Sequence, residues 1–180
     1  MADSIAIVTQ ALSIGAPTYT QDFTKSGFGT PVGAMIMLTY GVTDATAANH
    51  AQWAFGFMDG SSQMSYATYG EDNVLATTTY AETKDSTTKF LVTLPPTSNV
   101  FDTLATASFI TDGVRLSFTD APPSGYLATI IMFGGPGITG CHVDVLDHGG
   151  VVGTNVDYTM SWQPDIVFCF TNVTSSMNDN

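Results

Sequence analysis

The stretch LATASFITDGVRLSFTDAPPSGYLATIIMFGG, residues 104–135, predicts three strands joined by two tight turns. Apolar and polar residues alternate on both sides of Asp112-Gly113, and this dipeptide is a strong hairpin signal. A second turn falls at 121–125, where prolines and a glycine follow one another. The run 126–133 is almost continuously apolar, which is typical of an interior strand buried on both faces. We therefore expect an antiparallel sheet at the centre of an all-β domain.

Short strand-like runs separated by turn signals continue along the rest of the chain, and no helical period is sustained. This spacing predicts an antiparallel β-sandwich, jelly-roll-like, with about ten short strands. Further strands are expected at 5–14, 32–40, 52–58, 63–69, 74–81, 88–94, 141–146 and 165–170. Residues 18–30 and 82–86 are expected to be exposed connections, and 44–49 a short helical turn.

The chain has 180 residues, which suits one domain spanning 1–180. Its two ends contain similar patterns, because 22–26 (DFTKS) is echoed by 157–161 (DYTMS), and a proline and an apolar run follow each. This makes 5–40 and 141–172 a candidate internal repeat. Recurrence of strand–turn–strand units in any β protein is the alternative explanation. A true repeat would imply a longer product, or a C-terminal end that a neighbour completes.

Charge is scarce and acidic. The chain has 4 basic against 16 acidic residues, a net charge of −12, and only 11% charged residues. Without clustered lysine and arginine, neither nucleic acid nor an anionic membrane surface is an expected partner. A surface of small polar residues loses little on desolvation, which favours a subunit that assembles with other proteins, often as a homo-oligomer. A Thr-rich β surface without a partner is the alternative.

Targeting and redox signals are few. The first residues, MADSIAIVTQ, lack the basic and apolar regions of a signal peptide, so synthesis in a cytoplasm is expected. No apolar run approaches the length of a membrane-spanning helix. Cys141 and Cys169 are expected to be buried, reduced thiols, with a disulfide between them left open.

The cluster CHVDVLDH at 141–148 is the richest candidate for a metal site. His142 and Asp144 would share one strand face, and imidazole with carboxylate suits zinc or another divalent ion. No spacing supplies a third ligand, so a solvent-facing polar strand is preferred, and no metal or cofactor is assigned. Acidic turns such as Asp59-Gly60 offer oxygens for calcium, but turn chemistry explains them. No nucleophile elbow, phosphate loop or zinc-protease motif occurs, so we expect a non-enzymatic protein with no catalytic residue.

Aromatic residues offer an alternative function. Ring stacking on sugars would make the chain a carbohydrate-binding β-sandwich module for surface adhesion, although alternating aromatics more often belong to a core. The stacking candidates are Trp53, Tyr66, Tyr69 and Trp162.

Three segments are similar to parts of structural proteins of tailed-bacteriophage virions: 53–60 (WAFGFMDG), 108–135 and 162–167 (WQPDIV). They cover less than half of the chain and are patterns of turns and strands. The resemblance implies a β-rich capsid decoration (cement) or tail-associated subunit, located in the virion and made in a host cytoplasm. It carries over no catalytic residue. We therefore expect a virion structural subunit that acts by binding other virion subunits.

Overall fold

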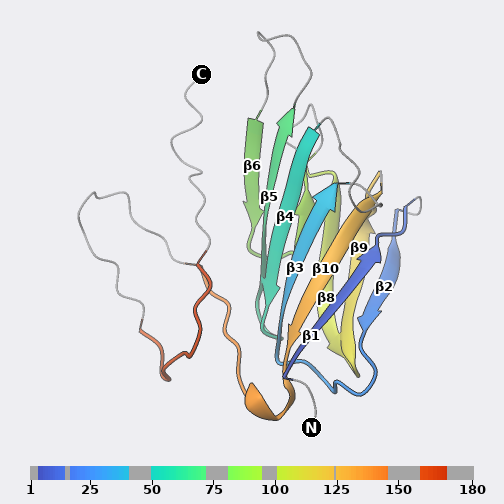
Figure 1. Cartoon of the computed structure of the whole chain (residues 1–180). Helices are drawn as coiled ribbons and strands as arrows, with labels where there is room; N and C mark the ends of the chain where they lie inside the picture. Colours follow the sequence, from blue (N-terminus) through green and yellow to red (C-terminus); the bar gives the residue numbers. More distant parts are fainter. Residues whose placement is uncertain are drawn as a thin grey trace, which may run out of the picture.

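The computed structural model describes residues 4–14, 17–40, 50–71, 81–94, 101–123, 125–145 and 159–169. Within these ranges, ten strands form two antiparallel sheets that pack face to face (Figure 1). The only helical element among them is a short 3-10 turn, Gly135–Gly137. The predicted all-β sandwich is confirmed.

Sheet A has six strands in the order β1 (Ile5–Ala11), β10 (Tyr126–Phe133), β3 (Gly33–Tyr40), β4 (His50–Met58), β5 (Gln63–Glu71) and β6 (Ala81–Ser86). Sheet B has four, in the order β2 (Tyr19–Thr24), β9 (Gly113–Asp120), β8 (Thr103–Ile110) and β7 (Leu91–Thr93). The first two strands pair with the last two, β1 with β10 and β2 with β9, on opposite sheets. The two sheets are thus linked through these end strands, whereas β3 to β6 run as a simple meander within sheet A.

The core lies between the two inner faces, where every second residue of most strands is buried. Its largest fully buried side chains include Tyr126, Phe23 and Phe90. One polar bridge crosses it: the Tyr126 hydroxyl donates to Gln52 Oε1 over 2.8 Å, and Gln52 Nε2 donates to the Leu94 carbonyl over 2.6 Å. Because both polar groups of the Gln52 amide are bonded, the residue can be buried without an orphaned group.

The central hairpin is confirmed, with its turn at Asp112, whose φ is 62°. Here an aspartate is favoured because it tolerates the left-handed region and its carboxylate finds local donors. Asp112 accepts hydrogen bonds from the backbone N–H groups of Gly27 and Gly29, at 3.0 and 2.7 Å. The following strand, β10, is interior as predicted, but only one of its faces is fully buried, since its burial alternates.

Four local predictions are wrong. Residues 19–24 and 81–86 form β2 and β6, where connections were expected; both are edge strands, and one side of an edge strand can be polar because it meets water. Residues 141–145 and 165–169 form no strand, although both read as strands. The predicted helical turn at 44–49 and most of the predicted strand at 74–81 lie outside the described residues. The internal repeat stays a prediction.

Candidate functional site

The outward side of sheet A is apolar across most of its width. One line of registered neighbours crosses five strands from β1 to β5: Ile7, Ile131, Met35, Phe57 and Met64. A second line of registered neighbours, parallel to the first, contains Met37, Phe55 and Tyr66. A third contains Leu127 and Trp53. We call these ten residues, together with Ile5 and Phe133, the apolar face.

Several members of the apolar face remain open to solvent. Ile7 is 62% exposed, Trp53 54%, Ile5 47% and Met37 38%. Scattered exposed apolar residues are normal on a protein, but a contiguous patch on one sheet face typically marks an interaction surface. The apolar face is therefore our candidate functional site.

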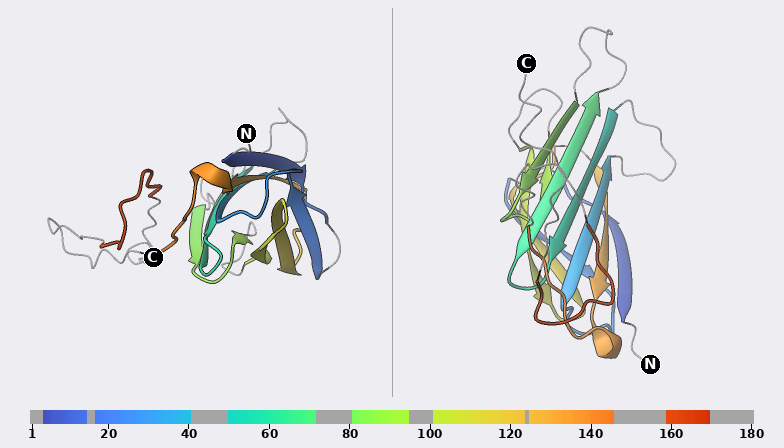
Figure 2. Two further views of the ribbon diagram at one scale, coloured as in Figure 1. Left: turned by 90° about the horizontal axis from the view of Figure 1, so that it is seen from below. Right: turned by 90° about the vertical axis from the view of Figure 1, so that its left-hand side faces the viewer.

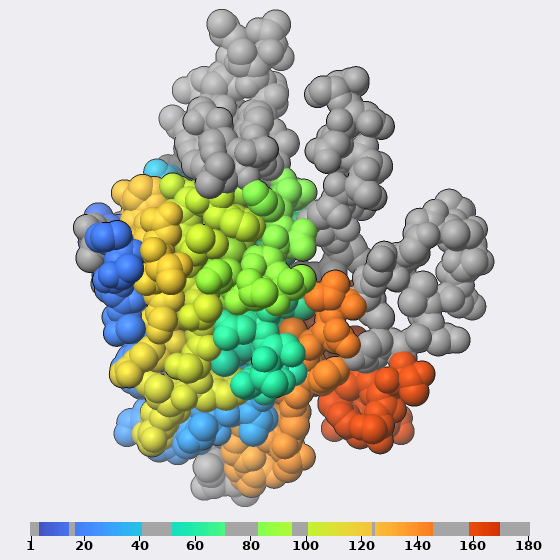
Figure 3. Space-filling model, turned by 180° about the vertical axis from the view of Figure 1, so that it is seen from behind, coloured from blue at the N-terminus to red at the C-terminus, as the bar shows by residue number. Residues whose placement is uncertain are grey.

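The outward side of sheet B, which faces the viewer in Figure 3, has the opposite chemistry. Its residues are mainly threonine and serine around one bidentate ion pair, in which Arg115 donates to the two Asp22 oxygens over 2.7 and 2.8 Å. The outward residues of its three longer strands are Thr20, Asp22, Thr24, Leu104, Thr106, Ser108, Ile110, Arg115, Ser117 and Thr119. The molecule thus has one apolar and one polar broad side.

The described residues that follow the 3-10 turn, 138–145 and 159–169, lie on the outer side of sheet A (Figure 2). Cys141 packs against Gly33 at the start of β3, in space that a side chain at Gly33 would fill. Asp59, in the β4–β5 turn, holds the next residues: its Oδ2 accepts from the Val143 N–H over 2.9 Å. Its Oδ1 accepts from the N–H groups of Ser61 and Ser62 over 2.9 and 2.7 Å. One carboxylate therefore builds the turn and fastens residues 141–145 to it.

Two pKa shifts follow from this packing. Burial of Asp59, whose side chain is 4% exposed, would raise its carboxyl pKa, but the donors from Ser61, Ser62 and Val143 outweigh burial and hold the pKa below its usual value. Burial raises the pKa of the Cys141 thiol, and the charge of Asp59 adds to that effect. A thiol with a raised pKa is a poor nucleophile, so Cys141 is suited to packing.

The predicted metal pair is close in space but does not converge. His142 Nε2 lies 3.8 Å from Asp144 Oδ2, while its Nδ1 lies 3.5 Å from Asp59 Oδ2. The imidazole therefore stands between two carboxylates, each facing a different ring nitrogen. In the described part of the chain, no group of three or more His, Cys, Asp or Glu is arranged to hold a metal ion. Because 141–145 is not a strand, the shared strand face expected for His142 and Asp144 is wrong.

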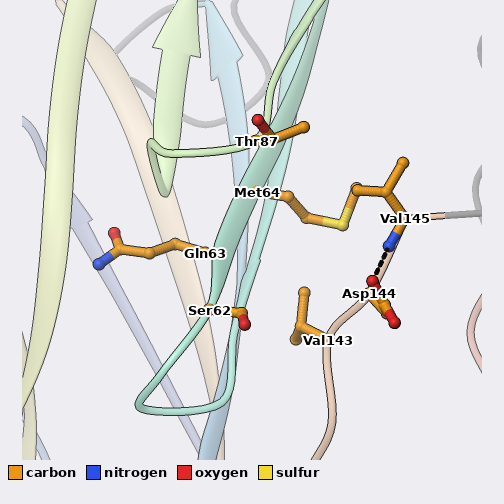
Figure 4. Close-up of a pocket in the computed structure, with 7 residues that line it drawn as sticks. All are labelled: Ser62, Gln63, Met64, Thr87, Val143, Asp144 and Val145. Carbon is orange, nitrogen blue, oxygen red and sulfur yellow. Dashed lines mark hydrogen bonds between the residues drawn. The ribbon is translucent and has the colours of Figure 1, made fainter.

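A pocket of about 190 Å³ lies between the β4–β5 hairpin and residues 143–145 (Figure 4). Its lining residues are Ser62, Gln63, Met64, Thr87, Val143, Asp144 and Val145. Figure 4 shows the Met64 and Val145 side chains facing each other across it. Sites for small molecules are usually about 300–1,000 Å³ and deeply concave. This pocket is better explained as the gap between a packed segment and the sheet below it.

The structure divides the four candidate stacking residues. Trp53 and Tyr66 both point outward on the apolar face, where they are diagonal neighbours on paired strands. Tyr69 is 2% exposed and belongs to the core, so it cannot stack on a sugar; its odd spacing from Tyr66 already places the two on opposite faces. Trp162 is 46% exposed but lies on the irregular segment 159–169.

Sequence reasoning missed the exposed apolar side chains at both ends of the described chain. Ile166, Val167 and Phe168 are 69%, 72% and 58% exposed, although a buried strand was predicted there. The Phe168 ring lies 6.4 Å from the ring of Phe133, centroid to centroid, which brings this segment to the border of the apolar face. The alternation of Ile5 and Ile7 with Ala6 and Val8 marks one face of β1, but it does not indicate that this face is exposed.

Comparisons with known proteins identify no relative: no family model, no curated protein and no solved structure matches the chain. Among the described residues, no helix has the length and apolar character needed to cross a bilayer.

Proposed function

We propose that this protein is a non-enzymatic structural subunit of a virion, such as a capsid decoration or tail-associated protein, that acts by binding other protein subunits. The apolar face is the observation that carries the proposal. Covering an already half-buried large apolar side chain stabilises a contact by about 1 kcal/mol, roughly half the value for full burial. A partner that covered Ile5, Ile7, Met37 and Trp53 would gain several such contributions.

The distribution of charge supports the same proposal. On β1, β10, β3, β4 and β5 the outward residues in the lines of the apolar face are uncharged, and the outward carboxylate Asp85, registered opposite Tyr66, lies on the edge strand β6. A partner would therefore displace water from apolar and small polar groups and would leave no ion unpaired. The shortage of basic residues argues against a position that faces packaged DNA. Location in a virion rests on the resemblance of the strand and turn patterns to phage structural proteins.

A matched pair of variants tests the proposal. Met37→Glu places a charge on the apolar face, and Ser108→Glu places the same charge on an exposed position of the polar side, next to Arg115. Both sites are on interior strands, so their folding costs should be similar. We expect wild-type protein and Ser108→Glu to co-sediment with particles from the source material, and Met37→Glu to bind at least about tenfold more weakly. Electron microscopy with labelled antibody should show a regular array.

Two results would contradict the proposal. Purified protein that stays off every particle of the source would remove its basis. Equal binding of both glutamate variants would show that the apolar face is not the contact.

The second candidate function is carbohydrate binding, which the adjacent outward positions of Trp53 and Tyr66 favour. Aromatic rings on a flat surface can stack on sugars, although this face offers few polar groups to fix a sugar's orientation. Tryptophan fluorescence measured against a glycan set tests it, with Trp53→Ala and Trp162→Ala compared. Quenching that Trp53→Ala abolishes would support carbohydrate binding, and unchanged emission would count against it.

A further inference from the structure

The two sheets have four edge strands, and β1 differs from the other three. The edge strand β6 contains Lys84 and Asp85, β2 contains Asp22, and β7 has only 3 residues. Natural proteins protect sheet edges with charge, proline or short length, because exposed edges pair with other strands. From Ser4 to Ile14, around and within β1, there is no charged residue and no proline. The protection that the other edges have is missing from β1.

Hydrogen-bond alternation shows which residues of β1 face outward. The Ser4 carbonyl accepts from the Gly134 N–H at one end of the strand, and the Leu12 N–H donates to the Tyr126 carbonyl at the other. Even-numbered residues therefore bond to β10, and the N–H and C=O groups of the odd-numbered residues point away from the sheet. At the C-terminal end of β1 the outward Ala11 carbonyl is already bonded, because Gln21 Nε2 donates to it over 2.9 Å. Within the described residues, no backbone hydrogen bond reaches the outward groups of Ile5, Ile7 and Thr9, which form the open part.

The side chains of the open part, like its backbone groups, are available for contact with a partner. Ile5 and Ile7 are 47% and 62% exposed and begin the lines of the apolar face. A strand added beside them would continue sheet A, satisfy the outward backbone groups and cover both isoleucines. The open part of β1 therefore offers a partner strand both backbone hydrogen bonds and apolar contacts.

Charge and symmetry favour a second copy of this chain as that partner. Two molecules with a net charge of −12 repel each other, so they approach best where neither carries a charge. An antiparallel pairing about a two-fold axis at Ile7 places Ile7 opposite Ile7 and Ile5 opposite Thr9. All three outward residues then form hydrogen-bonded pairs, in which the two partners exchange two N–H···O=C bonds. The three pairs give about six backbone hydrogen bonds. Two-fold contacts of this kind are the commonest in oligomers.

We propose that the open edge of β1, Ile5–Ile7–Thr9, pairs with the same edge of a second copy and joins two copies of sheet A into one continuous sheet. This proposal rests on the proposed function, because it names one partner of an assembling subunit. Five residues make a small contact compared with standard interfaces, so we expect a dissociation constant on the order of 0.1 mM. Such a contact acts mainly where copies are already concentrated, as in an assembly.

Complementary charges at Ile7 test the symmetry directly. The Ile7→Lys variant alone would place two positive charges opposite each other at the axis, and the Ile7→Glu variant alone two negative charges. Each variant alone should therefore be monomeric. An equimolar mixture should recover dimers at least as well as wild type. Sedimentation velocity over a concentration series measures all four samples, and thermal unfolding checks that each variant is folded. Met37→Glu is the control, since it alters the apolar face and leaves the edge intact.

Amide hydrogen exchange on wild-type protein provides a second readout that needs no variant. With rising concentration, the N–H groups of Ile5, Ile7 and Thr9 should become protected, whereas those of Ala6 and Val8 already bond to β10 and should change little. Dimers that persist in either charged variant alone, a mixture that fails to recover, or unprotected odd-numbered amides would overturn the proposal. Wild-type protein that stays monomeric at every concentration would also overturn the proposal. The proposed function would still be tested separately, by comparing how Met37→Glu and Ser108→Glu bind to particles.

Discussion

Changing Asp59 to asparagine should release residues 141–145 from sheet A while leaving the β4–β5 turn in place. The Ser61 and Ser62 N–H groups and the Ser61 hydroxyl all donate to Oδ1, at 2.9, 2.7 and 2.8 Å. These three donors fix the single amide oxygen of asparagine at the turn. The amide nitrogen then faces the Val143 N–H, so a donor meets a donor where Oδ2 accepted a hydrogen bond.

The size of the effect follows from the nature of that bond. A hydrogen bond to a charged acceptor contributes about 1.5–3 kcal/mol, and Asp59 is well shielded from water, with 4% of its side chain exposed. Loss of the bond should therefore shift the balance between the docked and released segment roughly ten- to a hundredfold. Release uncovers the Cys141 thiol, which packs on Gly33 in the docked state.

Thiol labelling measures this release. The Cys169→Ser background is needed because Cys169, contrary to the expectation of a buried thiol, is exposed and would react first. The labelling rate of Cys141 should rise about ten- to a hundredfold in Asp59→Asn. Ser61→Ala is the matched control, since it removes one bond within the turn and none to Val143, and its rate should stay within about twofold of wild type. An unchanged rate in Asp59→Asn, or an equal rise in Ser61→Ala, would refute the reasoning.

The remaining predictions concern acid, the core and one close approach. Because the folded-state pKa of Asp59 is lowered, its stabilising contribution is complete above the unfolded value of about 4 and is lost as the pH falls through the folded value; Asp59→Asn should therefore flatten acid unfolding below about pH 4, and an identical acid profile would contradict this. Tyr126→Phe should cost about 1–3 kcal/mol in urea unfolding, because buried Gln52 loses a donor, whereas Tyr40→Phe at an exposed ring should cost under about 0.5 kcal/mol. Gly56→Ala should destabilise the fold by about 3 kcal/mol or more, because the new methyl group would overlap the Phe90 carbonyl. A variant more stable than wild type would show that β4 and the residues just before β7 can move apart.

Sequence reasoning predicted the fold where side-chain alternation and turn chemistry agreed. The hairpin at Asp112-Gly113 and the interior strand 126–133 are such places, and both are present. It failed for β2 and β6, because a strand at a sheet edge can present polar residues to water and so resembles a loop. It also failed for 165–169, where an apolar run suits a buried strand but lacks a neighbour to pair with in the described structure.

The candidate site was only partly predictable, for a different reason. The alternation of Trp53, Phe55 and Phe57 identifies one side of a strand, but sequence cannot say whether that side meets a second sheet or water. The odd spacing of Tyr66 and Tyr69 places the two rings on opposite faces, but only the packing of sheet B decides that Tyr69 is the buried one. The link between Asp59 and Val143 joins residues far apart in sequence, so no local pattern indicates it.

The difference between the two broad sides bears on where such a subunit would sit within the proposed virion role. A subunit packed inside a shell contacts neighbours on several sides, and each of those sides should be poor in charge. Here the apolar residues gather on sheet A, while sheet B presents hydroxyl groups and the Asp22–Arg115 pair to solvent. A sandwich of this kind suits a protein that covers another layer with one side and meets water with the other. Pairing of β1 edges would widen the covering side without using the polar one, because β1 belongs to sheet A. Both features therefore favour a decoration protein on the outside of a particle over an internal component.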